Sequence, residues 1–236
     1  GMLDNNVIII TGAAGALGVA VSYKFVELGA RVALVDRAAD RLDQNCGTLK
    51  EKGALLIGSV DGTKAEDAES MATQVREHFG QIDGLVNIVG GFWSGTPVHE
   101  SPEDRWDFMF NLNAKSTFLA SKAVIPHLIE NGGGKIVNIG AKGGLTAPAN
   151  QGAYGASKSA VLRLTEAMSA ELKDHLINVN AVIPSILDSE ANRKAMPQAD
   201  PDKWVTPDAL ADVIAFLCSD QARAIHGALI PVYNRN

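Results

Sequence analysis

Short apolar runs alternate with segments of helical period along the whole of this 236-residue chain. Several runs, such as Val7-Ile8-Ile9-Ile10, are β-branched and show no polar alternation, which is typical of strands buried on both faces of a sheet. An end-to-end alternation of strands and helices predicts a doubly wound parallel sheet with helices on both faces, in a single α/β domain over residues 1–236. The expected strands are residues 7–10, 31–36, 54–60, 85–89, 135–139, 177–183 and 228–232.

The helical segments between these runs carry recognisable start and stop signals. Gly29 and Gly80 follow segments of helical period and are expected to end their helices, and Thr63 is the expected N-cap of the third helix. Pro126 lies inside the fourth helix, where we expect a possible break. The expected helices run from the first glycine turn to residue 28, over 37–52, 63–79 and 102–130, from Tyr154 to about residue 175, and from 207 to about 219.

Residues 185–206 form a polar, proline-bearing segment that is long for a loop in such a fold. Long loops in compact domains usually carry a function. We therefore predict that this segment is a lid over a substrate.

The first predicted strand is followed by Gly12-Ala13-Ala14-Gly15-Ala16-Leu17-Gly18, which opens the first helix. Small residues at this position let the backbone approach a pyrophosphate, and the helix N-terminus supplies amide hydrogens and partial positive charge. The alternative is a tight turn that needs glycine only for its dihedral angles. The position of the turn, after a buried strand and before a helix, favours a dinucleotide-binding cradle.

Asp36 lies at the end of the second predicted strand, 18 residues after Gly18. A carboxylate there can accept hydrogen bonds from both adenosine ribose hydroxyls and repels a 2′-phosphate. The alternative is a solvated acid in a turn. Asp36 favours NAD(H), but the neighbouring Arg37 is able to pair with a 2′-phosphate, so NADP(H) stays open.

Tyr154 and Lys158 are four residues apart in a segment of helical period and therefore project from one face of a helix. An ammonium near a phenol favours the phenolate, so the pair predicts a proton donor and acceptor that works near neutral pH. Alone, the same spacing is more typical of a packed ring and a solvated amine. The cradle and Asp36 shift the balance towards the catalytic interpretation.

Composition restricts the partners. The net charge is -6 without any Lys/Arg-rich block, which argues against nucleic acid and anionic membranes as partners. No apolar run reaches the length of a membrane span, and the first residues lack the pattern of a signal peptide. Cys46 and Cys218 are far apart in sequence, so we expect free thiols, no metal site and a cytoplasmic protein.

Together these motifs resemble the short-chain dehydrogenase/reductase family over residues 7–232. Thr11-Gly12 to Gly18 is similar to the family's glycine turn, Asp61-Gly62 to its adenine contact, and Asn87-Ile88-Val89-Gly90 to its Asn-Asn-Ala-Gly segment. The resemblance implies a Rossmann-like fold and a proton-transfer site of Tyr154, Lys158 and Asn113, with Asn113 holding a water in a relay. The cofactor-binding residues it implies are Gly12, Gly15, Ala16, Leu17, Gly18, Asp36, Arg37, Asp61, Gly62, Asn87, Val89, Gly90, Ile139, Tyr154, Lys158, Pro184, Ser185 and Leu187.

Two positions depart from the family pattern. Ala16 replaces the second glycine of the turn, which leaves slightly less room for the cofactor. Ala141 stands where the family has a serine 13 residues before the tyrosine, so an oriented donor to the substrate carbonyl is missing. Either ordinary carbonyl reduction is slow, or the substrate does not need that serine.

Dihydropteridine reductases, one branch of the family, also have Ala-Lys at this position. The segments Gly90-Gly91-Phe92-Trp93 and 187–200 resemble theirs as well. This resemblance implies a flat pterin-type substrate that stacks on Trp93, although a loop tryptophan packed under the lid is an equal alternative. We therefore name Trp93 and Ala141 as candidate substrate residues.

The resulting hypothesis is an NAD(P)-dependent oxidoreductase that acts on a small carbonyl, alcohol or pterin-type substrate, with Tyr154 as general acid/base. A dihydropteridine reductase proper is one alternative, and a dinucleotide sensor without catalysis, motivated by Ala141, is another. A purely structural α/β subunit is less compatible with the glycine turn and Asp36. The resemblance also implies a homodimer or homotetramer formed through the 102–130 helix and the helix that bears Tyr154.

Overall fold

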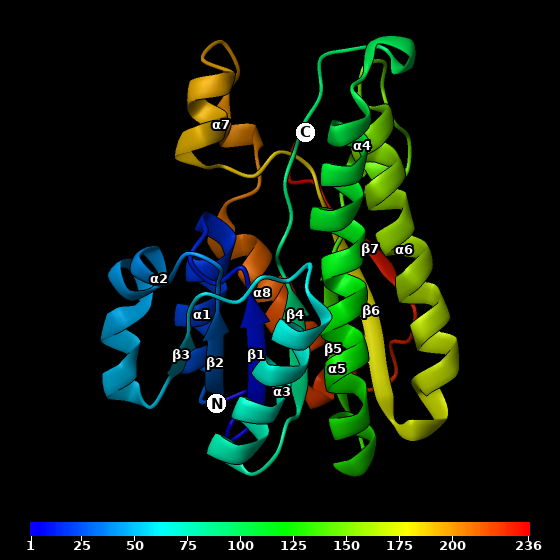
Figure 1. Ribbon diagram of the computed structural model, residues 1–236. Helices are drawn as coiled ribbons and strands as arrows, with labels where there is room; N and C mark the ends of the chain where they lie inside the picture. The colour runs from blue at the N-terminus through cyan, green and yellow to red at the C-terminus, as the bar shows by residue number, and fades with distance from the viewer.

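The computed structural model describes all residues from Gly1 to Asn236. Its core is one parallel seven-stranded sheet with the strand order β3-β2-β1-β4-β5-β6-β7, which is the doubly wound arrangement predicted (Figure 1). All the carboxyl ends of the strands therefore meet at one edge of the sheet. The strands are β1 (Val7–Thr11), β2 (Arg31–Val35), β3 (Leu55–Ile57), β4 (Gly84–Asn87), β5 (Gly134–Ile139), β6 (Ile177–Pro184) and β7 (Leu229–Val232).

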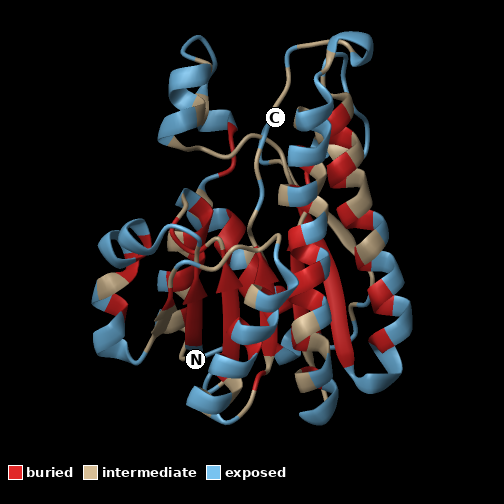
Figure 2. Cartoon of the chain, in the orientation of Figure 1, coloured by how far each residue is buried: buried red, intermediate tan, exposed pale blue.

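Helices cover both faces of the sheet, and the strands between them are buried (Figure 2). On β1, Ile8 and Ile10 belong to the core on one face, while Val7 and Ile9 belong to the core on the other. This is the alternation that a pleated strand imposes when both faces are covered. The helices are α1 (Ala16–Glu27), α2 (Ala39–Cys46) and α8 (Pro207–Leu217) over the first face, and α3 (Ala65–Phe79), α5 (Ser116–Glu130) and α6 (Gly152–Leu172) over the second, with α4 (Glu103–Met109) and α7 (Glu190–Ala195) near the carboxyl edge.

Two helical predictions need correction. The segment 102–130 is not broken at Pro126, which lies inside α5; its irregular part is the π-helical turn η3 (Phe110–Lys115) between α4 and α5. Val124 and Leu128, on either side of the proline, are fully buried, and this packing outweighs the loss of one backbone hydrogen bond. The segment 37–52 also changes at Cys46 from an α-helix to the 3-10 helix η1 (Gly47–Lys52).

Thr63 does not cap α3. The cap residue is Lys64, whose side chain makes no capping bond. The Thr63 hydroxyl donates instead to Asp61 Oδ1 at 2.6 Å, because a charged acceptor lies within reach in the preceding turn.

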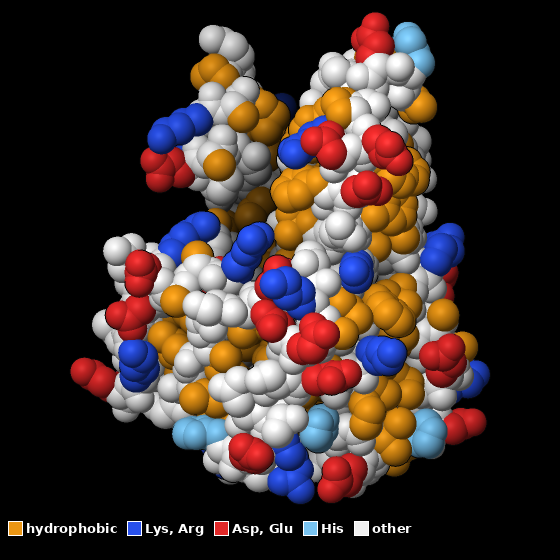
Figure 3. All heavy atoms as spheres, viewed as in Figure 1, with side chains coloured by type: hydrophobic (Ala, Val, Ile, Leu, Met, Phe, Trp, Pro, Cys, Tyr) orange, Lys and Arg blue, Asp and Glu red, His pale blue; other side chains and the backbone are white.

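The segment 185–206 is ordered by local contacts. An isolated bridge joins Leu187 to Val205, and Ser189 caps α7 by accepting from the Asn192 amide at 3.1 Å. In Figure 1, α7 rises above the carboxyl edge of the sheet on one side, and α4 and α6 rise on the other; the space-filling view shows a hollow between them (Figure 3). No helix of this chain combines the length and the apolar character needed to cross a membrane.

Candidate active site

A cleft of about 490 Å³ opens at the carboxyl edge of the sheet. Its volume falls within the usual range for small-molecule sites, about 300–1,000 Å³. The wall is formed by the glycine turn, the ends of β2, β3 and β4, and the start of the 185–206 segment. Among the predicted cofactor residues, it includes Gly12, Gly15, Ala16, Leu17, Gly18, Asp36, Arg37, Asp61, Gly62, Val89, Gly90 and Leu187.

The glycine turn is shaped by the space around each glycine. Gly12 adopts a φ of +63°, in the left-handed region that favours glycine. A Cβ on Gly18 would overlap the Gly12 carbonyl oxygen, so a side chain is excluded there. A Cβ on Gly15 would have no atom closer than 3.7 Å, and no side chain caps the α1 amides. The turn therefore presents an open backbone surface and a helix N-terminus to the cleft, which fits a pyrophosphate.

Asp36 is held in place by two backbone amides. Its Oδ2 accepts from the Ala14 amide at 3.0 Å, and its Oδ1 accepts from the Ala38 amide at 2.9 Å. Each carboxylate oxygen keeps a further lone pair for a ligand hydroxyl. Arg37 and Arg41 line the same cleft and neither forms an ion pair; Arg41, one turn into the next helix, was not among the predicted residues.

Asp61 lies where the chain turns towards α3. The hydroxyl and the amide of Thr63 both donate to its Oδ1, and these bonds lower the pKa of the Asp61 carboxyl. Asp61 is therefore a fixed acceptor in the part of the cleft that also contains Gly62.

Lys158 lies close to this cleft. Its side chain is buried, and Nζ donates to the Ile139 carbonyl at the end of β5 at 3.1 Å. A Cβ on Gly90 would lie 3.3 Å from Nζ, so Gly90, which lines the cleft, lies next to the ammonium and leaves little room for a side chain between them. Burial lowers the pKa of Lys158 to about 8.

The prediction that Lys158 lowers the pKa of Tyr154 is wrong. Burial raises the pKa of Tyr154 to about 12, because desolvation disfavours the charged phenolate. The phenol is therefore protonated at neutral pH and is suited to donate a proton.

The aromatic ring that contacts Tyr154 belongs to Phe92 and not to Trp93. The centroids of the Phe92 and Tyr154 rings are 4.7 Å apart in an edge-to-face arrangement, and Phe92 is 59% exposed. Trp93, predicted from the resemblance of this loop to a Gly-Gly-Trp loop, is partly buried, and neighbouring side chains on an extended loop point in different directions.

Asn113 lies in the π-helical turn η3 and joins three elements. Its Oδ1 accepts from the Gly91 amide at 2.8 Å, and its Nδ2 donates to the Gly91 carbonyl at 3.1 Å and to Ser157 Oγ at 3.0 Å. Its side chain therefore connects the loop after β4 to α6 beside Lys158. π-turns of this kind are frequent at functional sites.

The remaining predicted residues lie around this centre. Ala141 is buried and extended, and offers only a methyl group. Asn87 does not line the cleft: its amide is buried and donates to Asn138 Oδ1 at 2.9 Å. Pro184 ends β6, and the hydroxyl of Ser185 donates to the Tyr233 carbonyl at 2.8 Å, so Ser185 joins the last strand to the 185–206 segment.

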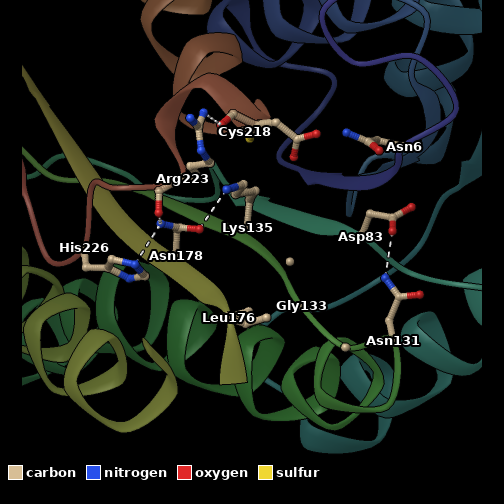
Figure 4. A pocket seen from close by; sticks show the side chains of 13 residues that line it. Asn6, Asp83, Asn131, Gly133, Lys135, Leu176, Asn178, Cys218, Arg223 and His226 are labelled. Carbon is tan, nitrogen blue, oxygen red and sulfur yellow. Dashed lines mark hydrogen bonds between the residues drawn. The ribbon is translucent and has the colours of Figure 1, made fainter. Parts of the chain in front are cut away.

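A second cavity, of about 410 Å³, lies at the amino edge of the sheet (Figure 4). Lys135 Nζ donates there to Asn178 Oδ1 at 2.7 Å, and Asp83 accepts from the Val7 amide, Gln81 and Asn131. Lys135 and Asp83 are thus engaged within the protein, at the end of the sheet opposite to Tyr154. No group of three or more His, Cys, Asp and Glu side chains in the chain is placed to hold a metal ion.

The comparisons with known proteins agree with this geometry. A family model described as short chain dehydrogenase matches residues 6–200. The chain is 33% identical to 2-(S)-hydroxypropyl-CoM dehydrogenase 3 of Xanthobacter autotrophicus, over 98% of this chain and 96% of that protein. It is 34% identical to 7alpha-hydroxysteroid dehydrogenase of Bacteroides fragilis, over 97% and 93%. Among solved structures, NAD+-bound xylitol dehydrogenase superposes with a TM-score of 0.91 at 27% identity, over 99% of this chain and 100% of that one.

Proposed function

This chain belongs to the short-chain dehydrogenase/reductase family, and we propose that it uses NAD(H) to interconvert an alcohol and a carbonyl on a small molecule. Membership makes it an oxidoreductase with a nicotinamide cofactor. The observation that carries the finer proposal is that Gly90 lines the same cleft as the glycine turn and lies next to Lys158 Nζ, with Tyr154 one helical turn from Lys158.

Each residue of the site has a role that its environment supports. The α1 amides hold the pyrophosphate, Asp36 accepts from the adenosine ribose hydroxyls, and Lys158 donates to the nicotinamide ribose. The cofactor supplies or accepts the hydride. Tyr154 gives its phenolic proton to the substrate oxygen during reduction and takes one back during oxidation.

Asp36 supports a preference for NAD(H). Its two fixed oxygens match two hydroxyls and repel a 2′-phosphate. Arg37 and Arg41 are the groups that would accept NADP(H), since both are unpaired and border the same space.

The residues next to Tyr154 support a substrate that accepts hydride on a flat or conjugated ring. Ala141 provides no hydrogen bond to polarise a simple ketone, whereas the exposed Phe92 ring offers an apolar wall beside Tyr154. A quinonoid pterin fits this description and is the alternative substrate class. The 185–206 segment contributes Leu187, Ser189 and Ala191 to the cleft wall, which supports its role as a lid.

A substrate screen tests the proposal. Small alcohols, ketones and a quinonoid dihydropterin are offered with NADH, NADPH or their oxidised forms, and absorbance at the nicotinamide band is followed. We expect turnover that is faster with NADH than with NADPH. Cofactor binding without turnover of any acceptor would instead favour a dinucleotide sensor, and no binding would favour a purely structural role.

The ionisation of the two catalytic groups predicts opposite pH dependences for the two directions. Carbonyl reduction requires the protonated phenol and the Lys158 ammonium, so its rate falls as the pH rises through about 8, where Lys158 loses its proton. Oxidation requires Tyr154 as a base, so its rate rises with pH. Initial rates between pH 6 and 10 check this, and a reduction rate that stays constant across pH 8 would contradict it.

Phe92→Ala is expected to raise KM about tenfold for flat substrates and to leave cofactor affinity unchanged. It removes the exposed ring that we propose contacts the substrate, a contact worth about 0.5–1.5 kcal/mol together with the apolar area that it buries. Trp93→Ala is the matched control, on the neighbouring residue. Steady-state kinetics and NADH fluorescence titration separate the two effects. A larger change in KM for the Trp93 variant would mean that Trp93, and not Phe92, contacts the substrate.

Exposed aromatic side chains on and beside α5 support a homo-oligomer. Trp106, Phe108 and Phe118 are each more than 40% exposed, and apolar side chains gather over α4 and α5 (Figure 3). Exposed apolar patches of this kind mark association surfaces. We propose a homodimer or homotetramer formed through this face, which light scattering coupled to gel filtration measures.

A further inference from the structure

A network of buried hydrogen bonds runs through the core between the sheet and α6. Asn87 Nδ2 donates to Asn138 Oδ1 at 2.9 Å, Asn138 Nδ2 donates to Thr165 Oγ1 at 2.9 Å, and Thr165 Oγ1 donates to the Val161 carbonyl at 2.8 Å. Asn138 and Thr165 are completely buried, and Asn87 is nearly so. Buried polar groups are costly unless they are satisfied, and consecutive bonds in a chain strengthen one another.

Two members of this hydrogen-bond network, Asn138 and Thr165, lie on the two elements that Lys158 joins. Asn138 immediately precedes Ile139, whose carbonyl accepts from Lys158 Nζ. Thr165 follows Lys158 by seven residues, two turns along α6, so the two side chains lie on the same face of the helix. Strand β5 and helix α6 are therefore joined at two points, Lys158 to Ile139 and Thr165 to Asn138.

The rest of the packing between α6 and the sheet is apolar, through residues such as Leu162 and Met168. Apolar contacts are non-directional and allow small rotations and shifts of a helix, whereas a buried hydrogen bond is lost if its partners move apart. An oriented bond two turns below Lys158 fixes the rotation of α6 about its axis.

We propose that Asn138 and Thr165 are positioning residues for Lys158. Their hydrogen bond holds α6 on β5 in the rotation that keeps Lys158 Nζ at the Ile139 carbonyl and next to Gly90. Only the kinetic part of this proposal rests on the proposed function.

Thr165→Val tests it, since valine keeps the shape of threonine and removes the acceptor of Asn138 Nδ2. The matched control is Ser121→Ala, which removes the hydroxyl on α5 that accepts from Asn87 Nδ2 at 3.3 Å, in the same network but without a link to α6. Ser121→Ala loses one buried hydrogen bond and should lower Tm by about 2–4 °C. Thr165→Val loses the bond from Asn138 and the bond to the Val161 carbonyl, so its Tm should fall at least as far. Thr165→Ser restores the acceptor and should behave as the wild type.

The ionisation of Lys158, followed by NMR of lysine labelled at Nζ, is the readout that a merely structural role would not move. In Thr165→Val, a loosened helix admits water and raises the pKa of Lys158 from about 8 towards its ordinary value of about 10.4, with no change in Ser121→Ala. kcat falls about tenfold to a hundredfold in the valine variant only.

Equal effects of the two variants on kcat and on the Lys158 pKa, or no effect of Thr165→Val on either, would overturn the proposal. If none of the screened substrates is turned over, the NMR measurement decides alone, so a failure of the proposed function is distinguished from a failure of this one.

Discussion

Tyr154→Phe is expected to lower kcat about 10²–10⁴-fold, the usual contribution of a positioned general acid or base. The substitution removes only the phenolic oxygen and keeps the ring that Phe92 contacts. No protein group forms a hydrogen bond with this hydroxyl, so its loss leaves no buried partner unsatisfied and Tm should not fall. The affinity for NADH should stay at the wild-type value, because the glycine turn, Asp36 and Lys158 are untouched.

Tyr23→Phe is the matched control for this result. It makes the same chemical change at an exposed hydroxyl, which is hydrogen-bonded to Thr48 Oγ1 at 2.7 Å on the outer side of α1. Its kcat should equal that of the wild type. Undiminished turnover in the Tyr154→Phe variant would show that Tyr154 is not the general acid/base, without contradicting the proposed cofactor site.

The direction of the Tyr154 pKa illustrates what sequence spacing predicts and what it does not. An i, i+4 pair of tyrosine and lysine predicts correctly that both side chains project from one face of α6. The pKa depends in addition on how much water the fold removes from each group, which is a property of the whole site. Here burial raises one pKa to about 12 and lowers the other to about 8, so both shifts favour the neutral forms.

The cleft was predictable because it is built from local rules that meet at the carboxyl edge. A strand followed by a glycine turn, and an acid at the end of the next strand, place Gly12 to Gly18 and Asp36 side by side once the sheet is parallel. Arg41 and Phe92 were missed because their positions depend on the rotation of a short helix and the path of an extended loop. The π-turn at Asn113 was missed for a similar reason. This backbone form has no local sequence signal, and Asn113 is hydrogen-bonded there to Gly91 and Ser157, which lie on other elements.

Alanine substitutions at Gly18 and Gly15 of the glycine turn are expected to have different effects on stability, although both weaken NADH binding. In Gly18→Ala the new methyl group overlaps the Gly12 carbonyl oxygen and the Ala13 backbone, neither of which can rotate away. Overpacking of this kind costs about 1–3 kcal/mol, which corresponds to a fall of about 2–12 °C in Tm for a chain of this size. The turn moves, and NADH binding is lost together with stability.

Gly15→Ala places the same methyl group where no atom lies within 3.7 Å, at a residue with an ordinary negative φ of −79°. The fold should keep a Tm close to that of the wild type. Alanine restricts the unfolded chain by about 0.4–1 kcal/mol, which offsets its weaker preference for the N-cap of α1. The methyl group instead occupies the surface offered to the pyrophosphate, so the Kd for NADH should rise at least about tenfold, given the loss of close backbone approach at a helix N-terminus. Thermal unfolding and NADH fluorescence titration of both variants separate the two effects. A Gly15→Ala protein that binds NADH as tightly as the wild type would mean that the pyrophosphate does not approach this turn, and the cofactor pose proposed above would have to be abandoned.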